Sequence, residues 1–191
     1  MVESWDELEN ACCQCHSCDL CQNRKNVVFG VGCKTADVMF IGEGPGEQED
    51  IIGEPFVGPA GRLLDDMMSI IDLDRTNSYI ANIVKCRPPG NRDPQDHEQD
   101  ACIGYLRNQV ALVKPKIIVC LGRIAAKRII EPEFRITRQH GVWVKRGDVW
   151  MTAIYHPSAL LRDPSKRPET FEDLLSIRDK VRQIGTSVVK I

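Results

Sequence analysis

The residues with the clearest chemistry in this chain are its cysteines, which crowd at one end. Five of the nine lie within the first 21 residues, where three overlapping C-x-x-C pairs can be read. This spacing lets one turn of backbone present two thiolates to a metal ion or an iron–sulfur cluster. Cys86 and Cys102 lie far downstream, where a folded core could return them to the first group. The sequence therefore predicts a metal or cluster site. Its N-terminal candidates are Cys12, Cys13, Cys15, Cys18 and Cys21.

Three other polar features follow short apolar runs. The glycine-rich segment 42–46 permits tight turns and lets a planar ligand approach main-chain N–H groups. Pro45 lies inside this loop and we expect no helix directly after it, which excludes a dinucleotide-binding motif. Asn82 needs a partner from a ligand or the backbone, because it lies late in an apolar run. His156 could stabilise charge on a ligand or simply cap a strand end.

The elements that position these residues form an alternating pattern. Four short apolar runs predict buried strands, and helical spacing predicts helices between them. We therefore expect an α/β fold, a three-layer α/β/α sandwich with a central, mainly parallel four-stranded sheet. Ligands of such folds bind beyond the carboxyl ends of the strands, where the polar features lie. The expected strands are 37–42, 79–84, 116–122 and 150–155; the expected helices are 61–72, one starting near 93, 123–130 and 169–184, with a small hairpin or loop at 138–148.

Composition narrows the class of protein. The 191 residues are 42% hydrophobic, which suits one domain with a substantial core. The acidic segment 1–10 does not resemble a signal peptide and no apolar run has membrane-spanning length, so we expect a cytoplasmic protein with reduced thiols and no membrane partner. The net charge of −2 means that a nucleic-acid partner would meet local rather than global positive charge.

Five motifs occur in order along the chain. They are Cys15-x-x-Cys18-x-Leu20 leading to Val27-Val28-Phe29-Gly30, the loop GEGPG at 42–46, Phe56-Val57-Gly58, the segment 82–89, NIVKCRPP, and His156-Pro157-x-x-Leu160-Leu161-Arg162. Together they resemble the family 4 uracil-DNA glycosylases, the iron–sulfur branch of the uracil-DNA glycosylase superfamily. The resemblance implies an enzyme, acting as a monomer on single- or double-stranded DNA, that hydrolyses the N-glycosidic bond of deoxyuridine and leaves an abasic site.

The resemblance also implies a [4Fe–4S] cluster. Its ligands would be Cys15, Cys18, Cys86 and Cys102, and it would tie segment 12–21 into a single domain spanning residues 1–191. The cluster is expected to be structural rather than redox-active in catalysis. The remaining cysteines have no counterpart role and are expected to be spare thiols; they are Cys12, Cys13, Cys21, Cys33 and Cys120.

The same resemblance implies a base pocket. Phe56 would stack on uracil, and Asn82 would donate to O4 and accept from N3–H, which rejects the opposite polarity of cytosine. Main-chain groups of Glu43 and Gly44 would complete the contacts. His156 would stabilise the departing uracil anion near O2.

Further roles are implied on the sugar and phosphate side. Glu49 is the favoured carboxylate for stabilising the sugar cation and orienting water, with Glu43, Glu47 and Asp50 as alternatives. Leu160 or Leu161 would fill the stack that the base vacates. Arg162 and Arg87 would contact DNA phosphates.

One motif departs from the family pattern. Ser158 follows His156-Pro157 where alanine is common, as in a relative that forms a covalent DNA adduct. That relative also has a GEQPG loop and a basic insertion ending in histidine, and neither occurs here. We therefore expect turnover rather than trapping.

Two other classes of protein compete with this interpretation. An iron–sulfur electron-transfer protein without glycosylase activity would explain the cysteines but leave GEGPG, Asn82 and His156 idle. A zinc-stabilised binding domain usually has two close cysteine pairs, whereas here one pair joins two isolated cysteines.

Overall fold

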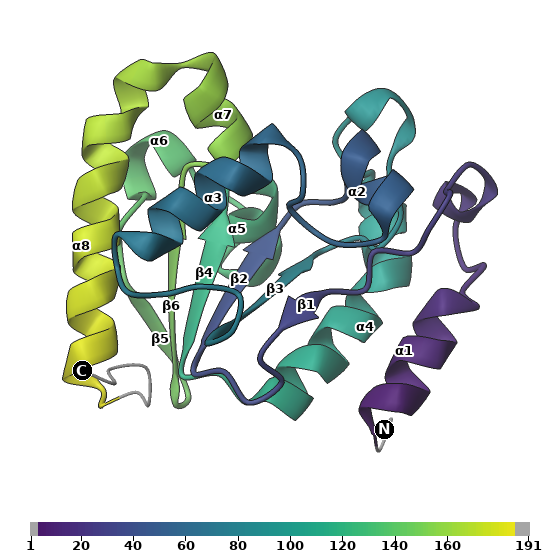
Figure 1. The fold of residues 1–191 in the computed structure, drawn as a ribbon, viewed down its shortest axis with the longest axis horizontal. Helices are drawn as coiled ribbons and strands as arrows, with labels where there is room; N and C mark the ends of the chain where they lie inside the picture. Colours follow the sequence, from purple (N-terminus) through teal and green to yellow (C-terminus); the bar gives the residue numbers. More distant parts are fainter. Residues whose placement is uncertain (1–3, 186–191) are drawn as a thin grey trace.

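The computed structural model describes residues 4–185, which fold around one mixed sheet (Figure 1). The sheet has six strands in the order β1-β3-β2-β4-β6-β5. Its four central strands run parallel, and the edge strands pair antiparallel with β3 and β6. The strands are β1 (Val31–Gly32), β2 (Val38–Gly42), β3 (Ser78–Asn82), β4 (Ile117–Leu121), β5 (Val144–Arg146) and β6 (Val149–Ile154).

The four expected strands are the central ones, and the expected count of four is wrong by the two edge strands. β1 has 2 residues and β5 has 3, and none of their side chains is fully buried. Each pairs with a single neighbour. Hydrophobic patterning cannot detect such strands, because backbone pairing rather than side-chain burial holds them in the sheet.

Side chains of the central strands alternate between two apolar layers. In β2, Met39 and Ile41 belong to one core cluster, while Val38 and Phe40 belong to the other. The first layer packs against α4 and α5, and the second against α3, α7 and α8, so helices cover both faces of the sheet (Figure 1). The α-helices are α1 (Trp5–Cys13), α2 (Glu47–Ile52), α3 (Pro59–Ser69), α4 (Asp96–Val113), α5 (Arg123–Ile129), α6 (Ile136–Gln139), α7 (Pro157–Arg162) and α8 (Arg167–Gln183).

Four helices lie where helical spacing predicts them: α3, α4, α5 and α8. α4 begins at Asp96, slightly after the expected start, because the Glu98 carboxylate accepts a hydrogen bond from the Gln95 N–H at 2.7 Å and caps the helix there. None of the helices within residues 4–185 is long and apolar enough to cross a membrane.

The expectation that no helix follows the glycine-rich loop is wrong. α2 begins at Glu47, directly after Gly46, whose N–H donates to Glu49 Oε2 at 3.1 Å and closes the first turn. Acidic side chains in this turn interact favourably with the positive end of the helix. The acidic run is therefore helical, and each of its carboxylates has a fixed direction. His156 likewise precedes a helix, α7, rather than a loop.

The strand order explains where a crevice opens. β3 lies on one side of β2 and β4 on the other, so the chain crosses over β2 between them. The loops that leave these strands diverge at the carboxyl end of β2. Such a switch point is the usual ligand site of a doubly wound sheet.

Candidate functional site

A cleft of about 710 Å³ opens at the carboxyl ends of the four central strands. Each strand delivers a residue to it: Glu43 after β2, Asn82 at the end of β3, Gly122 after β4 and His156 after β6. This volume lies in the range of about 300–1,000 Å³ that is typical of small-molecule sites. The residues expected in a base pocket all line this cleft: Glu43, Gly44, Phe56, Asn82 and His156.

Asn82 brings an unpaired acceptor to the cleft. The residue is 1% exposed, and its Oδ1 accepts no hydrogen bond from any residue between 4 and 185. Leaving a buried polar atom without a partner costs about 1–3 kcal/mol. The position therefore favours a ligand that donates a hydrogen bond. Gly42 makes the room, since a Cβ there would lie 2.4 Å from this oxygen.

Phe56 forms an aromatic surface beside Asn82. Its ring centroid lies 5.6 Å from that of His156, with the planes inclined by 32°. Its backbone is left-handed, with φ at 56°, which is uncommon for a bulky residue. A Cβ at Gly42 would lie 2.6 Å from the tip of the ring, so glycine there lets the ring extend over the end of β2.

His156 is held in one tautomer by its neighbour. The Ser158 backbone N–H donates to His156 Nδ1 at 3.1 Å, and because that group can only donate, Nδ1 is an acceptor. The ring proton of the neutral imidazole is therefore on Nε2. Burial, together with the positive charge of Arg162, lowers the pKa of His156 to about 4. At neutral pH the residue is an uncharged hydrogen-bond donor.

Glu43 has the opposite perturbation. Burial and the nearby Asp93 carboxylate raise its pKa to about 7, while Arg123 and Arg162 act against this shift. A carboxylate that gains and loses a proton near neutral pH is suited to general-base chemistry. Glu43 therefore combines position in the cleft with a suitable proton affinity.

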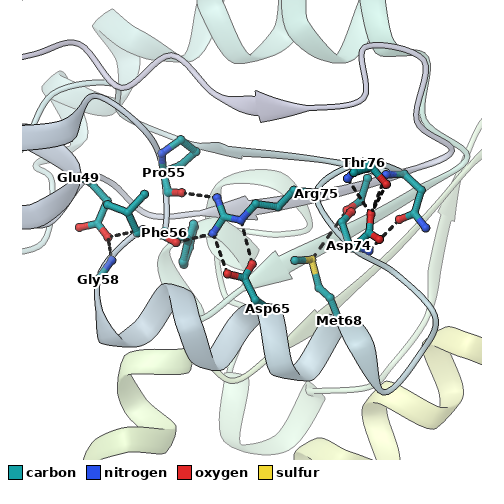
Figure 2. Close-up of polar contacts among 12 residues, drawn as sticks. Glu49, Pro55, Phe56, Gly58, Asp65, Met68, Asp74, Arg75 and Thr76 are labelled. Carbon is teal, nitrogen blue, oxygen red and sulfur yellow. Dashed lines mark hydrogen bonds and ion pairs between the residues drawn. The ribbon is translucent and has the colours of Figure 1, made fainter.

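Glu49 is engaged by the backbone on both of its oxygens. Oε1 accepts hydrogen bonds from the N–H groups of Val57 and Gly58, both at 2.9 Å (Figure 2), and Oε2 accepts the bond from Gly46. Glu49 thus fastens the glycine-rich loop to residues 57–58 while lining the cleft.

The other two acidic alternatives face different partners. Asp50 is 2% exposed and accepts a hydrogen bond from the Lys25 N–H at 2.9 Å, so it anchors the N-terminal segment instead. Glu47 forms an exposed ion pair with Arg87 at 3.5 Å. Glu47 also lines the cleft but is paired with Arg87, so Glu43 and Glu49 are the stronger candidates for orienting water.

The structure separates the two leucines that follow His156. Leu160 is 2% exposed and packs in the core with α3 and α8, so it is the less accessible of the two leucines expected to fill the stack. Leu161 is 42% exposed. Consecutive residues of a helix point about 100° apart, so one turn of α7 buries the first and presents the second.

The two arginines that were expected to contact DNA differ in how far their side chains are already engaged by other residues. Arg162 lines the cleft at the end of α7. Arg87 is occupied: its Nε donates to Asn91 Oδ1 at 2.8 Å and its guanidinium pairs with Glu47. Arg162 is therefore better placed to meet a phosphate than Arg87.

The expected cluster ligands Cys15, Cys18, Cys86 and Cys102 line one pocket between the N-terminal segment and α4. Cys12 and Cys21 also reach its wall, although they were expected to be spare thiols. The pocket supplies N–H donors to sulfur, as sulfur atoms of a metal site require. The Lys85 backbone N–H donates to Cys102 Sγ at 3.3 Å, and Arg24 donates to Cys86 Sγ at 3.3 Å.

The types of side chain in this pocket indicate which group it could hold. No three His, Cys, Asp or Glu side chains in the described part of the chain are arranged to hold a single metal ion. The all-cysteine donor set and its N–H donors fit an iron–sulfur cluster.

Sequence reasoning missed several residues of these sites. Asp93 and Arg123 line the cleft and form an ion pair across it. Arg24 also donates to the Cys15 carbonyl at 2.7 Å and so braces the cysteine loop. The position of Arg123 directly after a strand was a usable signal, since strand ends border the cleft. Asp93 and Arg24 could not be identified in this way, because their roles depend on contacts between segments distant in the sequence.

The chain is similar to known proteins over most of its length. The sequence family described as the Uracil DNA glycosylase superfamily matches residues 29–177. A Type-4 uracil-DNA glycosylase of Archaeoglobus fulgidus is 43% identical over 186 residues, which is 92% of each chain. The Type-4 uracil-DNA glycosylase of Sulfurisphaera tokodaii is 42% identical, covering 93% of this chain and 85% of the relative. That of Thermotoga maritima is 39% identical, covering 90% and 92%.

Proposed function

Because this chain belongs to the uracil-DNA glycosylase superfamily, we propose that it removes uracil from DNA by hydrolysing the N-glycosidic bond of deoxyuridine. The observation that carries this proposal is the buried, unpaired Oδ1 of Asn82 in a cleft between Phe56 and the glycine-rich loop. A base must leave the duplex to enter such a cleft, at a cost of about a few kcal/mol.

Uracil is selected by its hydrogen-bonding edge. Asn82 Oδ1 accepts from N3–H and the side-chain amide donates to O4, while cytosine presents the reverse polarity at both atoms. The Phe56 ring stacks on the base, and main-chain groups of Glu43 and Gly44 complete the contacts. This arrangement satisfies the acceptor that the protein itself leaves unpaired.

The departing base is stabilised by a neutral histidine. Cleavage places negative charge on uracil, and the Nε2–H of His156 donates toward O2. The low pKa of this residue means that it stabilises the anion without transferring a full proton.

The sugar side uses two carboxylates with different tasks. Glu43 accepts a proton from the attacking water, consistent with its pKa near 7. Glu49 contributes negative charge beside the sugar cation while its oxygens hold the two loops together. Both expected catalytic carboxylates thus keep a role, with the proton assigned to Glu43.

DNA is held at the rim of the cleft. Leu161 is exposed on α7 and fills the gap in the stack. Arg162 and Lys166 line the same edge and neutralise phosphates.

A [4Fe–4S] cluster held by Cys15, Cys18, Cys86 and Cys102 completes the proposal. When bound, the cluster supplies iron–thiolate bonds that fasten the N-terminal segment to the end of β3 and to α4. The loop 87–95, which brings Asp93 to the cleft, lies between two of these ligands. No step of the hydrolysis uses the metal.

The test is an excision assay on anaerobically purified, iron-containing protein. Oligonucleotides with one deoxyuridine, single- or double-stranded, should become alkali-sensitive at that position. His156→Ala should slow this by about 10²–10³-fold, as loss of a charge-stabilising donor does elsewhere. Intact deoxyuridine after incubation with iron-loaded protein would refute the proposal and favour the electron-transfer alternative.

A further inference from the structure

The segment that carries Phe56 is held in an uncommon conformation by charged side chains from two directions. Phe56 has a left-handed backbone, and its carbonyl lies against the first turn of α3. The approach is so close that a Cβ at Gly61 would lie 1.8 Å from that carbonyl oxygen. Such a backbone persists only where its surroundings over-determine it.

Arg75 supplies the restraint on the carbonyl side. Its Nη1 donates to the Pro55 carbonyl at 2.9 Å, and its Nη2 donates to the Phe56 carbonyl (Figure 2). The guanidinium is oriented by Asp65 of α3, which accepts from Nε at 2.9 Å and from Nη2 at 3.4 Å. The planar fork of arginine presents donors to both carbonyls and to Asp65 in one fixed geometry, which the ammonium group of lysine does not reproduce.

Glu49 supplies the restraint on the amide side. Its Oε1 accepts from the next two N–H groups along the chain, those of Val57 and Gly58. A guanidinium thus holds the carbonyls of residues 55–56, and a carboxylate holds the amides of residues 57–58 (Figure 2). The peptide between these two groups is the one that directs the Phe56 ring into the cleft.

Arg75 is itself presented from a rigid turn. The Asp74 carboxylate accepts hydrogen bonds from the Thr76 N–H at 2.7 Å and the Asn77 N–H at 3.2 Å (Figure 2). This turn leads directly into β3, the strand that ends at Asn82. Arg75, which holds the carbonyls of residues 55 and 56, and Asn82 therefore lie on one continuous segment of chain.

We propose that Arg75 is a positioning residue for base recognition, which acts through Phe56 by holding the carbonyls of residues 55 and 56 and so setting the ring against the bound base. The proposal rests on the uracil-excising function given above. If Arg75 served only as an ion-pair partner of Asp65, its loss would affect folding stability but not base discrimination. The proposed positioning role predicts that base discrimination changes as well.

The test measures binding rather than cleavage. The probe is a duplex with one 2′-fluoro-deoxyuridine, which resists hydrolysis, and the reference is the same duplex with thymidine. The Kd for the thymidine duplex is divided by the Kd for the 2′-fluoro-deoxyuridine duplex. This ratio cancels the backbone contacts that both duplexes make, so it reports preference for the uracil base. Arg75→Gln should reduce this ratio about tenfold, a size usual for coupled neighbours. Asp65→Asn removes the ion pair, keeps the carbonyl bonds and should leave the ratio within about twofold.

A double-variant cycle tests whether the effect passes through Phe56. Phe56→Ala should lower the ratio alone, and adding Arg75→Gln should lower it no further. If Arg75→Gln does not fold, Arg75→Lys keeps the charge and should give an intermediate ratio. A ratio for the Arg75 variant equal to that of Asp65→Asn, or a further loss in the Phe56→Ala background, would overturn the proposal. Failure of the parent protein to prefer the uracil analogue would instead overturn the proposed function.

Discussion

Burial shifts the pKa values of two cleft residues, His156 and Glu43, in opposite directions. It lowers the pKa of His156 to about 4 and raises the pKa of Glu43 to about 7. Around neutral pH the histidine is therefore fully uncharged, while Glu43 is divided between its acid and its base forms. This pairing suits a reaction in which one group must donate a hydrogen bond to an anion and the other must accept a proton.

The pH dependence of excision follows from this pairing. The single-turnover rate should rise with pH through about 7, because the base form of Glu43 is required. Glu43→Gln should lower the rate by about 10²–10⁴-fold and remove this rise. Measurement between pH 5.5 and 9 decides the point, with Glu47→Gln as the exposed control carboxylate. A parent rate that is flat over this interval would contradict the assignment of the proton to Glu43.

Glu43 should also limit stability. Its pKa in the folded protein lies above the unfolded value of 4.5, so its contribution to stability is fully present below pH 4.5 and is lost as pH rises through about 7. Glu43→Gln should therefore raise the free energy of unfolding by about 1–3 kcal/mol at pH 8 and by much less at pH 5. Denaturant titrations at the two pH values measure this, and equal effects at both would exclude a shifted Glu43.

At the scale of single elements, α7 shows how a short helix sorts neighbouring side chains. Pro157 starts it directly after His156, and the next turn buries Leu160 while exposing Leu161. The histidine, the exposed leucine and Arg162 thereby share one element at the rim of the cleft. The residues proposed to act in base release and in duplex engagement therefore lie on one short helix.

The two leucines should respond differently to truncation. Leu161→Ala should reduce excision more from duplex than from single-stranded DNA, because only the duplex has a gap to fill. Leu160→Ala should instead destabilise the fold by about 2–5 kcal/mol, as loss of a core leucine does. Rates on both substrates, together with thermal unfolding, separate the two effects. Equal losses on the two substrates for Leu161→Ala would argue against a wedge.

We expect the N-terminal segment to depend on the proposed iron–sulfur cluster. Substituting alanine for Cys15, Cys18, Cys86 or Cys102 should each remove the cluster or the soluble protein, whereas Cys13→Ala and Cys21→Ala should retain iron. Iron stoichiometry after anaerobic purification measures this. Loss of iron in Cys12→Ala with Cys18→Ala unharmed would assign the ligand pair to Cys12 and Cys15 instead.

Apolar runs predicted the four parallel strands, because buried strands must be apolar on both faces. They also predicted the cleft, since polar residues at the ends of such strands converge at one edge. Sequence reasoning could not find β1, which is too short to carry a pattern, whereas β5 lies within segment 138–148, where a small hairpin or loop was expected. Nor could it separate Leu160 from Leu161, or show that Glu49 bonds to residues 57–58, because these depend on tertiary contacts.

At the scale of the whole molecule, the order of the strands assembles the site. Crossing over β2 brings the end of β3, with Asn82, beside the glycine-rich loop, while β4 and β6 deliver Arg123 and His156 from the other side. The loop 87–95 connects the two sites along the chain, since Cys86 lines the cysteine pocket and Asp93 lines the cleft. The central claim is that this sheet edge reads uracil through the side-chain amide of Asn82, whose oxygen is buried without a partner among residues 4–185.

The most direct test of that claim is product-resolved, single-turnover excision from duplexes with uracil or cytosine opposite guanine. The iron-loaded protein should release free uracil and abasic sites in equal amounts, and no cytosine. Asn82→Asp replaces the amide donor by a second acceptor, so uracil release should fall by about 10²–10⁴-fold while a trace of cytosine release becomes detectable. An undiminished rate of uracil release by Asn82→Asp, at matched iron content and thermal stability, would contradict the claim.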